Sequence, residues 1–106
     1  MKIITIDEYN SEVVRSEVPV LVDFFAPWCG PCKGLATVLE DISATYEGTL
    51  KVLKVDIDEP TNYELVTTLG IRSVPTMIFY KKGTIQETIV GAVPKNKIID
   101  AIENLF

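Results

Sequence analysis

Apolar residues fall along this chain in short continuous runs, separated by stretches with helical spacing. Residues 20–26 form an almost uninterrupted apolar run, which is typical of a central strand covered on both faces. Further stretches rich in apolar residues, at 2–5, 50–56, 76–81 and 85–90, predict the other strands. We therefore expect a five-stranded sheet, with residues 20–26 as a central strand.

Between the strands, apolar residues recur every three or four positions, which indicates amphipathic helices. Residues 5–16 begin with Thr5 and Glu8, a pair with the spacing of a capping box. A second helix begins close to residue 29 and ends near Tyr46, with Gly48 as its C-terminal stop. The apolar stripe of this second helix is predicted to contain Cys32, Leu35, Ala36, Leu39, Ile42, Ser43 and Tyr46.

Two further helices are predicted in the second half of the chain. Residues 58–70 favour a short helix, with Pro60 in its first turn and Gly70 at its end. Residues 94–104 predict the last helix. Its inward side chains are expected to be Ile98, Ile99 and Ile102, followed by Leu105 and Phe106.

The order of elements is βαβαβαββα, which predicts an α/β fold and a single domain over residues 1–106. The early crossovers favour parallel strands with right-handed connections. The short turn at Lys82-Gly83 forces the last two strands to be antiparallel. We therefore expect a mixed five-stranded sheet flanked by four helices on its two faces, with the site at the carboxyl ends of the strands.

The chemistry is concentrated in residues 26–33, Ala-Pro-Trp-Cys-Gly-Pro-Cys-Lys, which hold both cysteines and the only tryptophan. A thiolate at a helix start is stabilised by unpaired N–H groups and by the helix dipole. Cys29 precedes the first turn, so we expect it to face solvent and to act as the attacking nucleophile. Cys32 lies inside that turn on the apolar stripe, so we expect it to be the resolving thiol. Pro31 is tolerated in the first turn and stiffens the loop between the thiols.

Composition and charge exclude several other classes of protein. The net charge of −5 over 106 residues, with no basic cluster, argues against a nucleic-acid surface. No apolar run is long enough to span a membrane, and Asp7 interrupts any signal-peptide core, so we expect a cytoplasmic protein. In that compartment a disulfide is more often catalytic than structural.

The chain has no histidine, which removes Cys-His proteases, Ser-His-Asp hydrolases and Cys₂His₂ zinc sites. Its two cysteines cannot fill a four-thiolate metal site, and its six glycines form no phosphate-binding loop. We therefore expect neither a metal nor a cofactor.

Two charged residues interrupt the predicted strands. Asp23 lies in the central apolar run, where burial favours its neutral form. It is either a proton acceptor and donor for Cys32 or a carboxylate that caps a turn or reaches water. Lys54 is either a solvated strand residue or a charge partner that lowers the pKa of Asp23.

Residues 28–33, Trp-Cys-Gly-Pro-Cys-Lys, match the redox motif of the thioredoxin family residue for residue, and the chain resembles that family over nearly its full length. Asp23 matches the buried acid that the family places beneath the disulfide, and Lys54 matches its charged neighbour. Residues 70–76 resemble the segment that carries the family's cis-proline, and residues 90–92 resemble its glycine segment.

The resemblance implies a general protein-disulfide reductase. Cys29 would attack a substrate disulfide and Cys32 would resolve the mixed disulfide, with Asp23 as proton relay and Lys54 beside it. The partners would be disulfide-containing proteins and a thioredoxin reductase or equivalent dithiol donor, and the protein would be a monomer. The residues between the cysteines, Gly30 and Pro31, would tune the redox potential.

The resemblance also implies a mostly uncharged docking rim. Residue order alone makes Pro75 an ordinary trans strand opener, whereas the resemblance makes it cis and facing the disulfide. Val74 would offer its backbone N–H and C=O groups to an extended substrate. Trp28 would lie on this rim, although a half-buried core ring is the alternative. The complete rim would be Trp28, Gly30, Pro31, Val74, Pro75, Gly91 and Ala92.

The chain departs from the family pattern at a few positions, and other functions compete. Thr37 stands where many members have a proline, Gly34 replaces a larger apolar residue, and Phe25 stands where a second tryptophan is frequent. The competing hypotheses are an oxidase or isomerase, a redox-inert binding module with a structural disulfide, and glutathione-dependent reduction. The Gly30-Pro31 spacer disfavours the first and the last of these.

Overall fold

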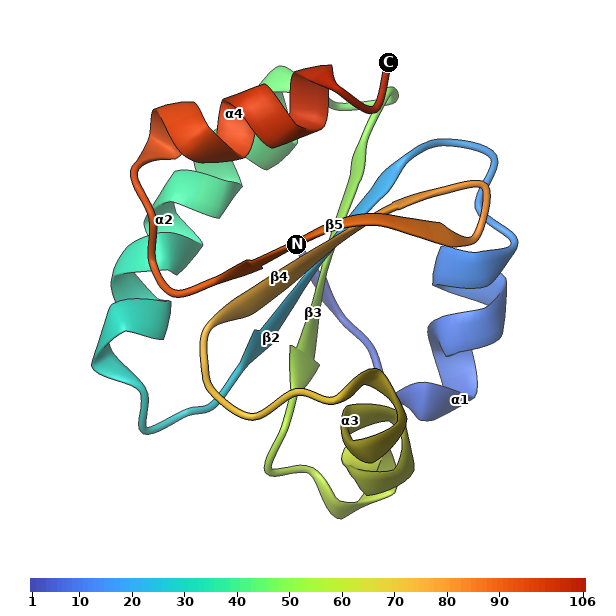
Figure 1. Cartoon of the computed structure of the whole chain (residues 1–106), viewed down its shortest axis with the longest axis vertical. Coiled ribbons are helices and arrows are strands. Elements are labelled where there is room, and N and C mark those ends of the chain that lie inside the picture. Colours follow the sequence, from blue (N-terminus) through green and yellow to red (C-terminus); the bar gives the residue numbers. More distant parts are fainter.

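Strand β2 (Val20–Phe25) is the central strand of the sheet (Figure 1). The computed structural model describes all residues, 1–106. β2 pairs in parallel with β3 (Lys51–Asp56) and in antiparallel with β4 (Thr76–Lys81). β1 (Lys2–Ile3) lies parallel to β3 at one edge, and β5 (Thr84–Val90) lies antiparallel to β4 at the other. The predicted mixed sheet is therefore confirmed, with strand order β1-β3-β2-β4-β5.

The helices form a layer on each face of this sheet (Figure 1). α2 and α4 pack on one face, whereas α1 and α3 pack on the other. None of the helices has the length and apolar character needed to cross a membrane. Their bounds are α1 Ile6–Tyr9, continued by a π-helical turn Asn10–Val14, α2 Gly30–Thr45, α3 Tyr63–Leu69, preceded by a 3₁₀ turn Pro60–Asn62, and α4 Lys95–Glu103.

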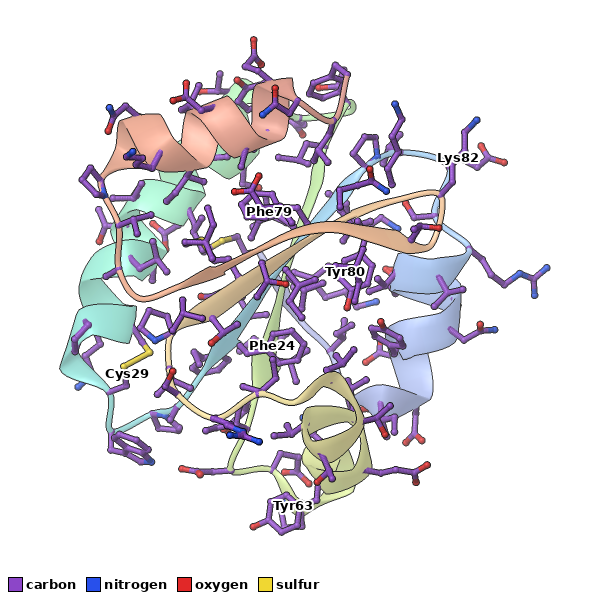
Figure 2. The ribbon with its side chains drawn as sticks, in the orientation of Figure 1. Phe24, Cys29, Tyr63, Phe79, Tyr80 and Lys82 are labelled. Atoms are coloured by element: carbon purple, nitrogen blue, oxygen red, sulfur yellow. A yellow bond between two sulfur atoms is a disulfide. The ribbon has the colours of Figure 1, made fainter.

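Successive side chains of β2 point to opposite faces of the sheet, so they are divided between two separate hydrophobic clusters. Leu21 packs with Phe79 and with the buried side chains of α2 and α4. Val22 and Phe24 point to the opposite face and pack with Tyr80 beneath α1 and α3. Figure 2 shows Phe79 on the α4 side and Tyr80 on the α1 side of the sheet. Both faces of β2 are therefore covered, as its apolar sequence predicts.

The β4–β5 turn shows why the chain needs glycine at one particular position. Lys82 and Gly83 both have positive φ, 52° and 78°, which is the conformation of a two-residue hairpin turn. A Cβ atom on Gly83 would lie 2.6 Å from the backbone oxygen of Val14. The turn thus brings the hairpin against the end of the π-helical turn. A side chain at residue 83 would prevent this close approach.

Two expectations about local structure are wrong. Thr5 makes no side-chain cap, because the Glu8 N–H that its hydroxyl would accept donates to the Thr5 carbonyl at 3.0 Å. The Glu8 carboxylate lies 3.0 Å from Lys2 Nζ in an ion pair. Phe106 is 59% exposed and stacks on Tyr46, because the chain leaves α4 before this residue. The early crossovers join parallel strands, as expected, whereas the connection through α3 leads to β4, which is antiparallel to β2.

Gly34 lies exposed within α2, and a Cβ atom at this position would meet no atom within 4 Å. Glycine in a helix interior destabilises it, so Gly34→Ala should raise the free energy of unfolding by about 0.5–1 kcal/mol. Urea unfolding of the oxidised protein would measure this change. Gly48→Ala is the matched control and should lower stability, because Gly48 has a φ of +85°. Equal effects at the two positions would contradict the prediction.

Candidate active site

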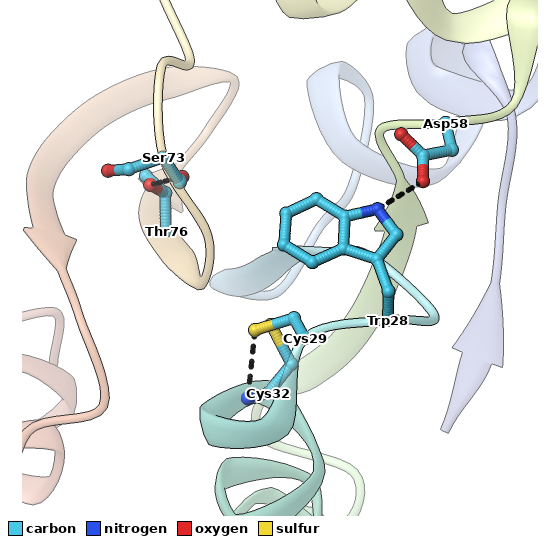
Figure 3. The surroundings of a disulfide bond; sticks show 6 residues. All are labelled: Trp28, Cys29, Cys32, Asp58, Ser73 and Thr76. Atoms are coloured by element: carbon cyan, nitrogen blue, oxygen red, sulfur yellow. Dashed lines mark hydrogen bonds between the residues drawn. A yellow bond between two sulfur atoms is a disulfide. The ribbon is translucent and has the colours of Figure 1, made fainter.

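The two cysteines form a disulfide at the junction of β2 and α2 (Figure 2). Cys29 is the N-cap of α2, and its Sγ accepts a hydrogen bond of 3.1 Å from the backbone N–H of Cys32 (Figure 3). The Cα atoms of the pair are 5.3 Å apart. In the reduced protein the sulfur at this position would be a thiol or thiolate facing the same N–H. The N-cap position therefore stabilises a Cys29 thiolate through a direct hydrogen bond and the positive end of a 16-residue helix.

The expectation that Cys29 faces solvent is wrong for the oxidised protein. Cys29 and Cys32 are each 4% exposed, because they form a small cluster with Ala26 against which Phe25, Ile57 and Val74 pack. Solvent exposure therefore does not distinguish the two sulfurs. Their positions in α2 do, because Cys29 is the N-cap and Cys32 lies within the helix. A pocket of about 160 Å³ opens beside Cys32, lined also by Phe25, Ala26, Pro27, Lys33, Ala36 and Lys54.

Asp23 lies on the face of the sheet that α2 covers, and it is fully buried. Neither of its carboxylate oxygens has a hydrogen-bond partner. Burial raises the pKa of Asp23 from its ordinary 3.8 to about 6, although the positive charge of Lys54 lowers it. The alternative in which this carboxylate caps a turn or reaches water is therefore wrong.

Lys54 is the cross-strand neighbour of Asp23 in the parallel pairing of β2 and β3. The Nζ atom of Lys54 lies 4.2 Å from the centroid of the Phe25 ring. The Lys54 ammonium group and the Asp23 carboxylate form no ion pair. Lys54 is half-exposed, so the two alternatives for this residue, a solvated strand residue and a charge partner of Asp23, each hold in part. Its ammonium group is solvated and still lowers the pKa of Asp23 from a distance.

Trp28 is 69% exposed, so the alternative of a half-buried core ring is wrong. Its indole N–H donates a hydrogen bond of 2.6 Å to Oδ2 of Asp58, in the loop after β3 (Figure 3). Sequence reasoning missed Asp58 as a site residue and placed it only in the first turn of a helix. Nothing in the local pattern connects residues 30 positions apart, and only the adjacency of β2 and β3 brings them together.

The loop before β4 supplies the other side of the site. The Val74–Pro75 peptide bond is cis, as the resemblance implies. Val74 packs against the cysteine cluster, and its backbone N–H and C=O make no hydrogen bond within the protein. The Gly91 N–H donates to the Pro75 carbonyl at 2.8 Å, which ties the end of β5 to this loop.

The predicted rim residues thus come from three separate segments of the chain. Trp28, Gly30 and Pro31 are exposed around the start of α2. Val74 is half-buried and Pro75 is buried in the cis-proline loop. After β5, Gly91 is half-buried and Ala92 is exposed.

A disulfide at the N-terminus of a helix, at the carboxyl end of a central strand, defines a thiol–disulfide oxidoreductase. The thioredoxin family model matches residues 1–104. The chain belongs to the thioredoxin family.

Individual relatives agree with this assignment. Thioredoxin 1 of Nostoc sp. is 46% identical over 100 residues, which covers 94% of this chain and 92% of that protein. The thioredoxin of Synechocystis sp. is 46% identical over 95 residues, covering 90% and 87% of the two chains. The chloroplastic M-type thioredoxin of Spinacia oleracea is 48% identical over 91 residues, which covers 86% of this chain and 49% of that protein. The similarity supports dithiol/disulfide reductase activity.

The raised pKa of Asp23 predicts a specific dependence of stability on pH. A folded-state pKa above the unfolded value gives stability that is fully present below pH 3.8 and lost as pH rises through about 6. The difference corresponds to about 3 kcal/mol at neutral pH. Asp23→Asn is neutral at every pH, so its stability relative to the unmodified protein should increase by up to this amount between pH 4 and pH 8. Urea unfolding of both oxidised proteins across this range would measure it, and a pH-independent difference would contradict the raised pKa.

Proposed function

We propose that the protein reduces disulfides in other proteins through a reversible Cys29–Cys32 dithiol. The observation that carries these roles is the hydrogen bond from the Cys32 N–H to the Cys29 sulfur at the start of α2. The Cys29 thiolate attacks one sulfur of a substrate disulfide, whose S–S bond breaks and whose other sulfur leaves as a thiolate. The product of this step is a mixed disulfide between Cys29 and the substrate.

The second step releases the substrate. Cys32 gives its proton to the Asp23 carboxylate and attacks the Cys29 sulfur. The Cys29–Cys32 bond forms, the mixed disulfide breaks, and the second substrate sulfur leaves as a thiolate. Two electrons pass from the dithiol to the substrate, whose thiolates take up protons. A pKa of about 6 suits Asp23 to this role, since its carboxylate is largely ionised at pH 7 and is a stronger base than an ordinary aspartate.

Substrate docking on the cis-proline loop is part of the same proposal. The unpaired N–H and C=O groups of Val74 can each bond to an extended substrate, as in the addition of a strand. Trp28, Gly30, Pro31, Gly91 and Ala92 complete a mostly uncharged surface around the disulfide. We further propose that Gly30 and Pro31 tune the redox potential and that Lys54 moderates the pKa of Asp23.

The cellular setting belongs to the proposal as well. An external dithiol, such as a thioredoxin reductase, would reduce the Cys29–Cys32 bond after each cycle. We propose a monomer that acts in the cytoplasm on disulfide-containing proteins; some relatives carry the name of a chloroplastic form, so cell fractionation is the direct test. That residues 1–106 act as a single domain stays a prediction.

The reduction potential of the pair distinguishes the proposed direction from its alternatives. Equilibration with dithiothreitol or glutathione buffers, followed by alkylation and mass measurement, would count free thiols. A potential between about −300 and about −230 mV, on a scale whose reference values include thioredoxin itself, supports a reductase. A potential above about −200 mV would favour an oxidase or isomerase, and a bond that stays closed below about −300 mV would be structural.

Cys32→Ser should trap the mixed disulfide, because the variant can attack a substrate but cannot release it. Incubation with a disulfide-bridged peptide should give an adduct through Cys29, visible by mass spectrometry and lost on addition of dithiothreitol. Cys29→Ser is the matched control and should trap far less, since Cys32 lacks the N-cap position. Equal trapping by the two variants would contradict the assigned roles.

A further inference from the structure

The turn that presents Val74 is closed in an unusual way. The chain bends over residues 73–75 immediately before β4, so that Val74 and Pro75 lie between Ser73 and Thr76; this bend is called the Ser73–Thr76 turn. No backbone hydrogen bond joins Thr76 to Ser73. Instead the Thr76 hydroxyl donates a hydrogen bond of 2.7 Å to the Ser73 carbonyl (Figure 3). A side chain therefore closes the turn that a backbone N–H would ordinarily close.

Thr76 is well placed to hold this turn, because it is fixed on both sides. It is the first residue of β4, and the sheet register places it between Phe24 of β2 and Val90 of β5. Its side chain is 3% exposed, so water does not compete for the hydroxyl. The Ser73 carbonyl is the one hydrogen-bond partner of the Thr76 hydroxyl in the protein. The bond thus connects a rigid strand to an otherwise irregular loop.

The loop on the other side of this bond has few attachments of its own. The Gly91 N–H holds the Pro75 carbonyl at 2.8 Å, but the backbone groups of Val74 bond to nothing in the protein. Arg72 and Ser73 are exposed. The Thr76–Ser73 bond is therefore the hydrogen bond that fixes the backbone on the N-terminal side of Val74.

We infer that Thr76 is a positioning residue for substrate, whose hydroxyl holds Ser73 so that the Val74 N–H and C=O are oriented towards an extended peptide. This inference rests on the proposed docking of substrate at Val74. Thr76 touches neither the substrate nor the sulfur atoms. Its effect should therefore appear in the recognition of peptide disulfides rather than in thiol chemistry.

The test is Thr76→Val, which keeps the shape of the side chain and removes the hydroxyl. The KM for a disulfide-bridged peptide should rise about fivefold, the usual value of one hydrogen bond, while kcat falls by less. Hydroxyethyl disulfide has no peptide backbone to pair with Val74. The preference for the peptide over hydroxyethyl disulfide, as a ratio of kcat/KM values, should therefore fall about fivefold too.

Two further variants separate a lost hydroxyl from a disturbed strand. Thr76→Ser keeps the hydroxyl and should restore the peptide KM. Thr88→Val makes the same substitution at an exposed position of β5 and should leave the activity unchanged. An unaltered peptide preference in Thr76→Val, or a Thr76→Ser variant as impaired as Thr76→Val, would overturn the inference.

The unmodified protein provides a test that does not depend on any variant folding. A Thr76 hydroxyl bonded to Ser73 and shielded from water should exchange its proton slowly enough to be seen by NMR. A hydroxyl proton in fast exchange with water would overturn the inference. If the unmodified protein reduces neither the peptide nor hydroxyethyl disulfide, the proposed function itself is overturned. If the unmodified protein reduces both, but Thr76→Val keeps the same preference for the peptide, only the role of Thr76 is removed.

Discussion

The burial of β2 on both faces is the constraint on which the site depends. A strand flanked by β3 and β4 and covered by two helical layers cannot shift without disrupting both hydrophobic clusters. Its carboxyl end is therefore fixed, and with it the position of Cys29 at the start of α2. The same burial encloses Asp23, whose charged form destabilises the fold by about 3 kcal/mol at neutral pH. That cost is a large fraction of the stability of a typical domain, about 5–15 kcal/mol.

The order of elements and the identity of the reacting atoms could be predicted from the sequence, because each depends on residues close together in the chain. The apolar run of β2 and the Cys-Gly-Pro-Cys motif are local signals of this kind. The registers of the strands, and the contacts between segments far apart in the chain, have no such local signal in the sequence. Asp58 reaches Trp28, and the buried Asn62 bonds to the Ile6 N–H, only because neighbouring strands and loops meet in the folded chain. The cis bond at Pro75 was expected from the family resemblance, whereas residue order alone favoured trans.

Two mistaken expectations share one physical cause, which is that a pattern reports burial tendency and not the partners available in space. Phe106 continues the apolar sequence beyond α4, yet it stacks on the Tyr46 ring at the surface. Cys29 precedes the helix and is therefore expected in solvent, yet it is buried in a cluster with Ala26 and Cys32, against which Val74 from a distant loop packs. In both cases a tertiary contact decided the exposure of the side chain. For Cys29 the contact matters more, because one of the residues that pack against its cluster, Val74, is also proposed to bind substrate.

That coincidence connects thiol chemistry with docking. Lowering a thiol pKa from about 8.5 to about 7 raises its thiolate fraction at pH 7 about 16-fold, while nucleophilicity falls about fivefold, so the net gain is only about threefold. A pKa shift of this size therefore supplies only a small part of the rate that a disulfide reductase needs. Positioning can supply far more, since holding two groups in reacting geometry contributes orders of magnitude. The sulfur of Cys29 is held at the start of α2. If substrate docks on the Val74 backbone as proposed, the rigidity of the Ser73–Thr76 turn would set how accurately the two meet.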